Sequence, residues 1–214
     1  MPVDESSRRD RKRLQTLTHL AIVAARLFAR RGFDAVTMEQ IAEAADVAKG
    51  TLYNHFPTKE AVLAYAIHHE LGHNLETLTK QLAPDVGFVK GIVPLMDALS
   101  EWCEAHPEYL APYLRFRFMD IQAATPDTGA SGPNDIVETY AWLIGNSQRS
   151  GELRKDLDAA HLAVLFHHIC LGALLRWLLT GNLKLRRELS TAVDLFVHGA
   201  AHRVAVAKKR RSRA

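Results

Sequence analysis

The sequence predicts an all-α protein of about nine to ten helices. In successive segments apolar residues recur every three or four positions, which places them on one face of a helix. The 8 prolines and 12 glycines lie mostly between those segments, where helices end. Of the 214 residues, 48% are hydrophobic and 24% are charged, as in ordinary soluble globular proteins. This length suffices for one or two domains with a sizeable hydrophobic core.

Basic residues are concentrated near the two ends of the chain. The formal net charge of +3 does not by itself indicate nucleic-acid binding, so its distribution matters. We expect residues 1–13 to form a basic, disordered arm that contacts DNA phosphate or the minor groove, the alternative being a solvated tail. We expect residues 208–214 to form a disordered basic tail that makes at most non-specific phosphate contacts.

Cysteine usage indicates the compartment. The 2 cysteines lie far apart in the sequence, and no signal-peptide pattern is present. Both features favour a reducing environment over a disulfide framework. We therefore expect a cytoplasmic protein.

The segment from Phe33 to Lys59 predicts two short helices joined by a tight turn. Thr37 is expected to cap the first helix together with Gln40, as a capping box. In the second helix Leu52 and Phe56 lie four residues apart on one face. Because each helix is too short to bury much, the pair has the size of a helix-turn-helix, whose second helix enters the DNA major groove.

The second of these helices has a polar face. Lys49, Thr51, Tyr53 and Asn54 lack apolar partners at core spacing, so we expect them to face outward. Together they form a donor-rich surface suited to phosphates and base edges. A sequence-specific DNA-binding surface is the prediction.

A long gapped pattern extends through this region. It comprises Thr37, Ile41-Ala42, Ala45, Val47, Lys49-Gly50-Thr51-Leu52-Tyr53, His55-Phe56-Pro57 and Lys59-Glu60. Over residues 14 to 65 the chain closely resembles the DNA-binding domain of TetR-type transcriptional regulators. Asp46 departs from the family pattern by replacing a turn glycine, although Asp tolerates the left-handed conformation. Ala48 replaces a common capping Ser or Thr, at a cost of about 1 kcal/mol.

The resemblance implies a ligand-responsive, sequence-specific regulator, more often a repressor than an activator, with no enzymatic activity and no cofactor. It implies a DNA-binding domain over residues 14–58 and a helical ligand-binding and dimerisation domain over residues 59–207. A homodimer would bind a palindromic operator with half-sites about 34 to 36 Å apart, or a multiple of this spacing. A small molecule would release it.

Roles in DNA binding follow for individual residues. Lys49 is expected to read a base edge, with guanine its usual partner. Phosphates are expected to be clamped by Thr37, Tyr53, His55 and Lys59, although His55 has an alternative role in packing. The full predicted set is Thr37, Lys49, Gly50, Thr51, Tyr53, Asn54, His55 and Lys59. The alternative is a non-specific DNA-binding protein that depends on its two basic ends.

The next predicted helix contains a rival motif. His69, Glu70 and His73 match the H-E-x-x-H pattern of zinc-dependent hydrolases. The extended form of that motif needs Gly at 76 and His at 79, where this chain has Glu76 and Thr79. Nothing in the sequence selects a third ligand, and an apolar stripe explains the same segment without metal. We expect no metal site.

Later segments predict a ligand cavity and its lining. We expect a short helix over residues 86–92, a new helix opened by Pro94, and a surface loop from Ala123 to Pro133.

Arg115 and Arg117 are interpreted as surface charges, with an anchor for an anionic ligand as the alternative. The effector is expected to be mostly apolar or aromatic. Its predicted contacts, for which core packing is the alternative, are Trp102, Tyr113, Phe116, Tyr140 and His168.

Residues 159–180 form the most apolar segment of the sequence. A membrane span is one interpretation, but His167, His168 and Arg176 interrupt a run that is barely long enough. A helix that is apolar on nearly every face must otherwise be buried on all sides. We therefore expect a homodimer, with no membrane, in which residues 134–150 and 159–180 of two chains form a four-helix interface.

Overall fold

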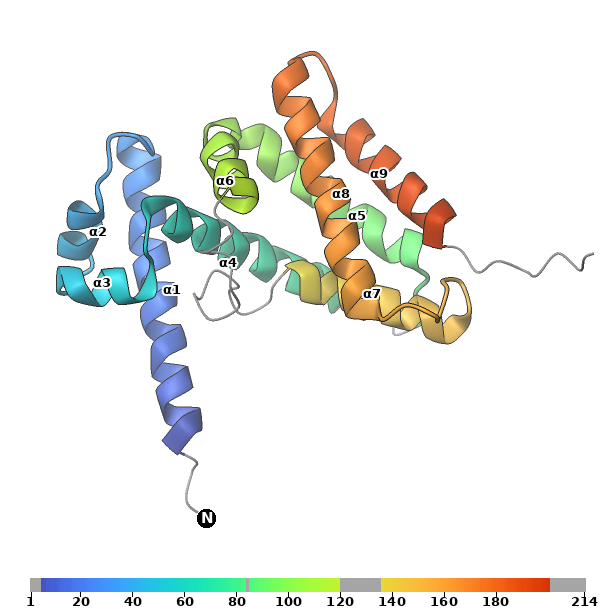
Figure 1. Ribbon diagram of the computed structural model, residues 1–214, viewed down its shortest axis with the longest axis horizontal. Helices are drawn as coiled ribbons and strands as arrows, with labels where there is room; N and C mark the ends of the chain where they lie inside the picture. The colour runs from blue at the N-terminus through green and yellow to red at the C-terminus, as the bar shows by residue number, and fades with distance from the viewer. Residues whose placement is uncertain (1–4, 84, 120–135, 201–214) are drawn as a thin grey trace, which may run out of the picture.

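The computed structural model describes residues 5–83, 85–119 and 136–200, which form nine α-helices and no strand. Figure 1 shows two groups of helices connected by one long helix. The first group, here called the N-terminal unit, comprises α1 (Glu5–Arg31), α2 (Met38–Ala44) and α3 (Lys49–His55). The second, here called the C-terminal bundle, comprises α5 (Phe88–Ala105), α6 (Pro107–Met119), α7 (Ile136–Ser150), α8 (Ala159–Thr180) and α9 (Leu185–Ala200).

The connecting helix is α4 (Lys59–Thr79), which takes part in both groups. It packs against α1 at one end and against α5, α6 and α7 along the rest of its length. Within the bundle, α8 packs between α7 and α9, and α9 also covers α5. Among the described residues, α4 therefore makes the main connection between the bundle and the N-terminal unit.

The N-terminal unit has a small and tightly packed core. The apolar face of α1, predicted from its spacing, is buried, and Ile41 of α2 and Leu52 of α3 lie fully beneath it at 0% exposure. Gly32 ends α1 in the left-handed conformation, with a φ of 80°, and its N–H donates to the Phe28 carbonyl at 2.8 Å. Glycine is the usual residue at such a helix end because it adopts this conformation without strain.

One boundary prediction was wrong. Residues 5–13, expected to be part of a disordered arm, form the first turns of α1. This stretch contains no Gly or Pro, and its Arg and Lys residues are good helix formers, so nothing stops the helix from continuing. The basic residues at positions 8–13 therefore lie on the exposed surface of a helix.

Two predictions for the bundle also need correction. A single helix, α5, replaces the separate helices predicted on either side of Pro94, which lies inside it. Pro94 is exposed, so the backbone carbonyl that loses its partner there lies near solvent. The predicted helix over residues 187–207 corresponds to α9, whose described part ends at Ala200. The predicted loop Ala123–Pro133 and the tail 208–214 lie outside the described residues.

Helix α8 has the predicted bounds and two different faces. Asp158 caps its first turn through its Oδ2, which accepts from the N–H groups of Ala160 and His161 at 3.0 and 3.2 Å. One face is buried against α7 and α9. Among the described helices α8 alone has the length and composition to cross a membrane, a test that core helices of soluble proteins also pass. Its other face exposes Val164, Leu165, Ile169, Leu175 and Leu179.

Candidate DNA interface and ligand cavity

The capping box at the start of α2 is formed as predicted. The Thr37 hydroxyl oxygen accepts from the Gln40 N–H at 3.3 Å, and the Gln40 side-chain oxygen accepts from the Thr37 N–H at 3.1 Å. Because the Thr37 oxygen is the acceptor in this box, the box does not use its O–H proton. That hydroxyl also interacts with Glu39, whose pKa is lowered by a backbone hydrogen bond and, to a smaller extent, by Lys49 and by a hydrogen bond from Thr37.

The turn between α2 and α3 relies on two unusual residues. Asp46 adopts a φ of 54°, so it takes the left-handed conformation usual for glycine in that place. Ala48 precedes α3 without any side-chain cap, as its residue type requires. Burial of Leu52 and Phe56, each 0% exposed, therefore holds α3 against the unit.

The outer face of α3 is exposed and polar. Lys49, Gly50, Tyr53 and Asn54 are exposed, whereas Thr51 is half-buried. Tyr53 leaves 46% of its surface in solvent, although a large aromatic ring gains from burial. The Lys49 ammonium lies 3.8 Å from the Glu39 carboxylate in a pair that solvent screens.

His55 lies half-buried at the end of α3, beside the basic part of α1. Burial lowers its pKa, and the positive charge of Arg13 lowers it further, so the imidazole is neutral near pH 7. The effect of Arg13 shows that this one residue of the basic stretch lies close enough to His55 to act on its charge. The sequence shows the basic residue, but its place near the end of α3 depends on the packing of α1.

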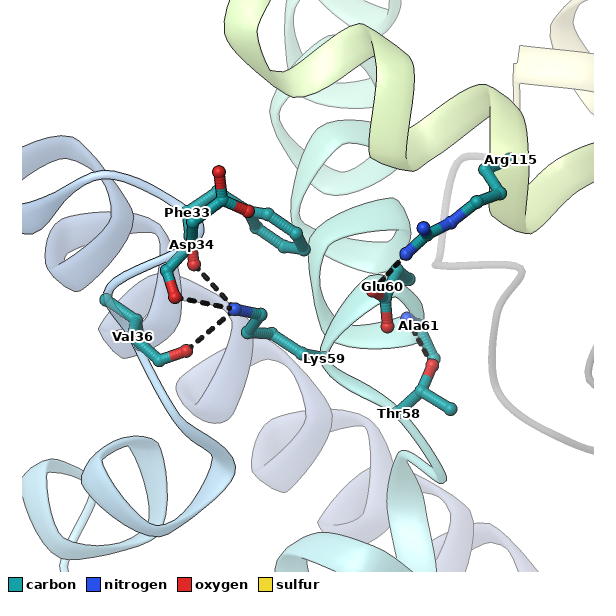
Figure 2. A network of polar contacts seen from close by, with 8 residues as sticks. All are labelled: Phe33, Asp34, Val36, Thr58, Lys59, Glu60, Ala61 and Arg115. Carbon is teal, nitrogen blue, oxygen red and sulfur yellow. Dashed lines mark hydrogen bonds and ion pairs between the residues drawn. The ribbon is translucent and has the colours of Figure 1, made fainter.

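Lys59 has a different role from the predicted phosphate contact. Its ammonium donates to the Phe33 carbonyl at 2.7 Å and the Val36 carbonyl at 2.8 Å, and it lies 3.4 Å from the Asp34 carbonyl (Figure 2). It also lies 4.3 Å from the centre of the Phe33 ring. Its three protons are thereby engaged within the protein, because the carbonyls after α1 need donors. Lys59 fastens the α1–α2 loop to the start of α4.

The next residue of α4 faces the C-terminal bundle. The Glu60 carboxylate accepts from the Arg115 guanidinium of α6 at 3.0 Å, as Figure 2 shows. Thr58 caps the same turn, since its hydroxyl accepts from the Ala61 N–H at 3.2 Å. Consecutive residues of α4 therefore contact the N-terminal unit and the bundle. The sequence contained no signal for this pairing, because Glu60 and Arg115 lie 55 positions apart.

A mostly apolar cavity lies where α4 meets the bundle. It has about 450 Å³ of space not occupied by protein atoms, part of it open to solvent. Three of the residues predicted as ligand contacts, Trp102, Tyr113 and Tyr140, line it. The other lining residues are Ile67, Leu71, Leu99, Cys103, Leu110, Ile136, His167, Cys170, Leu171, Leu174 and Leu189.

Two of the predicted ligand contacts were misplaced. Phe116 is buried at 2% exposure but packs in the core away from the lining. His168 is exposed, and its ring bonds the Val164 carbonyl of its own helix at 2.7 Å. His167 lines the cavity in its place. One residue rotates the side chain by about 100° around a helix, which is enough to exchange the two faces.

Two lining residues of the cavity, Tyr113 and His167, also make polar contacts behind it. Together with their partners His68 and Arg117, which do not line the cavity, they are here called the polar corner. The His68 ring bonds the Tyr113 hydroxyl at 2.8 Å, and Arg117 lies 3.3 Å from His167 Nε2. Complete burial lowers the pKa of His68 to about 3, with a smaller contribution from Arg117, so His68 is neutral.

A family model described as "Bacterial regulatory proteins, tetR family" matches residues 22–66, the segment that forms α2, α3 and their flanks. Residues 22–66 thus carry the DNA-binding domain of the TetR family, and the findings together support a TetR-family transcriptional regulator. It is a ligand-responsive DNA-binding transcriptional regulator and not an enzyme. The confirmed fold class is all-α with an N-terminal helix-turn-helix.

Similar proteins agree with this family. The HTH-type transcriptional regulator LuxR of Vibrio harveyi is 26% identical over 78% of this chain and 83% of its own length. The repressor KstR of Mycobacterium tuberculosis is 28% identical over 81% of this chain and 73% of its own. The TetR-family repressor FadR of Thermus thermophilus, solved with lauroyl-CoA, superposes with a TM-score of 0.69 and 26% identity, covering 89% of this chain and 98% of its own.

In this TetR-family protein the H-E-x-x-H segment has a structural explanation. The Glu70 carboxylate accepts from the Trp102 indole N–H at 3.0 Å, and the His69 ring stacks on Tyr65 at 6.5 Å between centres. Among the described residues no group of three His, Cys, Asp or Glu side chains is placed to hold a metal. The zinc-hydrolase alternative therefore has no support.

Proposed function

We propose that this regulator is a repressor that binds a palindromic operator as a homodimer and that an apolar molecule in the cavity releases it. The observation that carries the DNA-binding part is the exposed polar face of α3, whose opposite face is held in the core by the buried Leu52. Such a face lies in the major groove in helix-turn-helix proteins. We propose the cytoplasm as its location.

Roles on the DNA are proposed residue by residue. Lys49 reads a base edge, and Thr51, Tyr53 and Asn54 position it. Thr37, Tyr53 and His55 bind phosphates, with His55 as a neutral donor. At Gly50 an added Cβ would meet no protein atom within 4 Å, so the fold itself does not demand glycine there. Close approach of the DNA backbone would account for it.

Dimerisation is proposed through the outer faces of α7 and α8. The exposed apolar residues of α8 lie at helical spacing, and Trp142 of α7 leaves 41% of its surface exposed. Apolar surface of this kind is costly in water and typical of an interface. A twofold axis beside α7 and α8 would cover this surface with the same helices of a second copy. The two α3 helices would then face successive half-sites.

The ligand part of the proposal rests on the walls of the cavity. Ile67 and Leu71 of α4 line it, so a bound molecule contacts the helix whose first residue holds the N-terminal unit. A shift of α4 would change the separation of the two α3 helices and thus the fit to the operator. The lauroyl-CoA bound by Thermus thermophilus FadR supports an effector with an apolar chain.

The division into domains also remains a proposal, with a DNA-binding domain at residues 14–58 and a ligand-binding domain at residues 59–207. The first turns of α4 belong structurally to both. Lys59 holds the α1–α2 loop, and Tyr65 packs edge-on against Phe56 with 5.5 Å between ring centres. The two domains would therefore move relative to each other beyond Tyr65 rather than at residue 59.

Selection from randomised duplex DNA at physiological salt tests the DNA-binding part. We expect an enriched palindrome with half-sites about 34 to 36 Å apart, or a multiple of this spacing. Tight binding without enrichment would favour the non-specific alternative. In the selected operator, Lys49→Ala should cost about 1–3 kcal/mol at one half-site position and relax the base preference there. Equal loss on every sequence would make Lys49 a phosphate contact. The exposed Lys90 of α5 provides a matched control, Lys90→Ala.

A further inference from the structure

Two arginines of α6 differ in their partners. Arg115 keeps 69% of its side chain in solvent and pairs with the Glu60 carboxylate. Arg117 is half-buried, and its guanidinium donates to the Nε2 of His167 at 3.3 Å. Within the part of the chain that the structure describes, no carboxylate lies within ion-pair distance of Arg117. Among the described residues, the arginine that is more removed from water is therefore the one without a counter-charge.

The described residues around the Arg117 guanidinium, namely Tyr113, His68 and His167, do not supply a negative charge. Tyr113 is 4% exposed and its hydroxyl bonds His68, which is itself 1% exposed. His167, at 4% exposure, accepts from the guanidinium, which requires an unprotonated Nε2 and hence a neutral ring. A cation removed from water without an opposite charge is costly. An anion bound at the polar corner would therefore offset the free-energy cost of removing the Arg117 charge from water.

The polar corner also faces the cavity. Tyr113 and His167 belong to it and line the cavity, whereas nearly all other lining residues are apolar. A molecule that fills this space would place an apolar body among leucines and aromatic rings, with one end at Tyr113 and His167. The lining of the site therefore combines a mostly apolar surface with polar groups of Tyr113 and His167.

We propose that the polar corner binds the carboxylate of an apolar carboxylic acid, with Arg117 as the ion-pair partner and Tyr113 and His167 as hydrogen-bonding neighbours. This inference rests on the proposed function, because it names the class of effector for the same cavity. The planar guanidinium matches a carboxylate with two parallel hydrogen bonds, a geometry that an alcohol or an amine does not provide.

Binding at Arg117 has a direct route to the N-terminal unit. Arg115 lies two residues earlier in α6 and holds Glu60, and Lys59 holds the α1–α2 loop. An acid that draws Arg117 toward the cavity shifts α6, and with it the Arg115–Glu60 contact at the start of α4. The head group of the ligand, and not only its apolar part, then contributes to release from DNA.

Binding of matched probes to the full-length protein tests this inference. Dodecanoate, dodecanol and dodecanoyl-CoA are titrated at pH 7.5 by calorimetry, with octanoate and octanol as a shorter pair. We expect each acid to bind about tenfold more tightly than its alcohol. Arg117→Gln should remove that preference by weakening the acid about tenfold while leaving the alcohol within about twofold. Arg115→Gln, which removes a charge from the exposed side of the same helix, is the matched control and should keep the preference.

Other outcomes overturn the inference in distinguishable ways. Equal binding of acid and alcohol by the unaltered protein would show that the site does not read a carboxylate, and this result needs no variant. Binding of dodecanoyl-CoA alone would assign recognition to the nucleotide phosphates instead. In both cases an apolar ligand still binds, so the proposed function survives. If none of the probes binds, the apolar effector of the proposed function fails together with this inference.

Discussion

The N-terminal unit and the C-terminal bundle place their functional residues in opposite ways. In the unit the candidate DNA contacts lie on the outside of α3, over a core in which Leu52 and Phe56 are completely buried. In the bundle and the facing side of α4 the candidate ligand contacts line a mostly apolar pocket that is partly open to solvent. A surface that must match a DNA groove requires a rigid support, whereas a cavity that admits a ligand requires an interior that is not closely packed.

The two regions should differ most in how much free energy of unfolding is lost when a core side chain is truncated. Leu52→Ala should lower the free energy of unfolding by about 2–5 kcal/mol, because it opens a void in a tightly packed core. The matched change Leu99→Ala, at a half-buried residue that already lines the cavity, should cost under about 2 kcal/mol. Urea denaturation at one fixed protein concentration measures both. Equal losses would mean that the two regions are packed equally tightly.

The contact between the unit and α4 should give the next largest effect. Lys59→Met should lower the free energy of unfolding by about 2 kcal/mol, because carbonyls of the α1–α2 loop lose a charged donor. The salt dependence of operator binding should keep its slope, since Lys59 is not expected to contact phosphate. A slope lower by about 0.9 units would restore the phosphate role. Lys90→Met, at an exposed residue of α5, should change neither quantity.

The buried His68 of α4 should make the stability of the protein depend on pH. The folded pKa of His68 is lowered from 6.5 to about 3, so the unfolded chain takes up a proton between these values and the folded chain does not. Stability is therefore lost as pH falls through that window, by about 1.4 kcal/mol between pH 7.5 and pH 5.5. Thermal unfolding of His68→Gln, which cannot titrate, should show a correspondingly flatter dependence on pH.

Two groups act on His68 in the folded protein: the charge of Arg117 lowers its pKa, and the Tyr113 hydroxyl forms a hydrogen bond with its ring. His198→Gln, at an exposed residue of α9, serves as the control and should retain the pH dependence of the unaltered protein. An identical profile for His68→Gln and the unaltered protein would show that another group causes the acid sensitivity.

The ion pair between α4 and α6 should have the smallest effect on stability. Arg115→Ala should cost under about 1 kcal/mol, because most of the guanidinium is exposed and solvent screens the pair. Its effect should appear instead in how far a ligand lowers operator affinity. A double-mutant cycle with Glu60→Ala separates the pair from the individual residues. An unchanged ligand response in Arg115→Ala would exclude this contact as a route between the two regions.

Local features of the fold could be predicted from the sequence. The capping box of Thr37 and Gln40, the glycine cap at Gly32 and the left-handed Asp46 each depend on a few neighbouring residues. The bounds of α8 followed from the apolar run over residues 159–180, and the structure adds Asp158 and Gly181 as its caps. Such features are stabilised within one or two turns of backbone, so residue type and spacing suffice to place them.

Features that depend on packing were missed or misplaced. His167 rather than His168 lines the cavity because α8 turns that side of the helix toward the bundle. Pro94 was expected to open a helix, whereas the burial of Phe88, Ile92 and Leu95 on one face of α5 stabilises a helix through it. Burial of a continuous apolar face outweighs the hydrogen bond that one proline removes.

The sequence by itself determined the helix-turn-helix, the outward polar face of α3 and the apolar character of the bundle, because these depend on periodicity and caps. Only the tertiary structure decided that Lys59 holds a loop, that Glu60 meets Arg115, and that Arg117 lies half-buried beside a cavity without a carboxylate partner in the described residues. These contacts join residues from separate helices. A charged side chain takes its role from the groups that packing places around it.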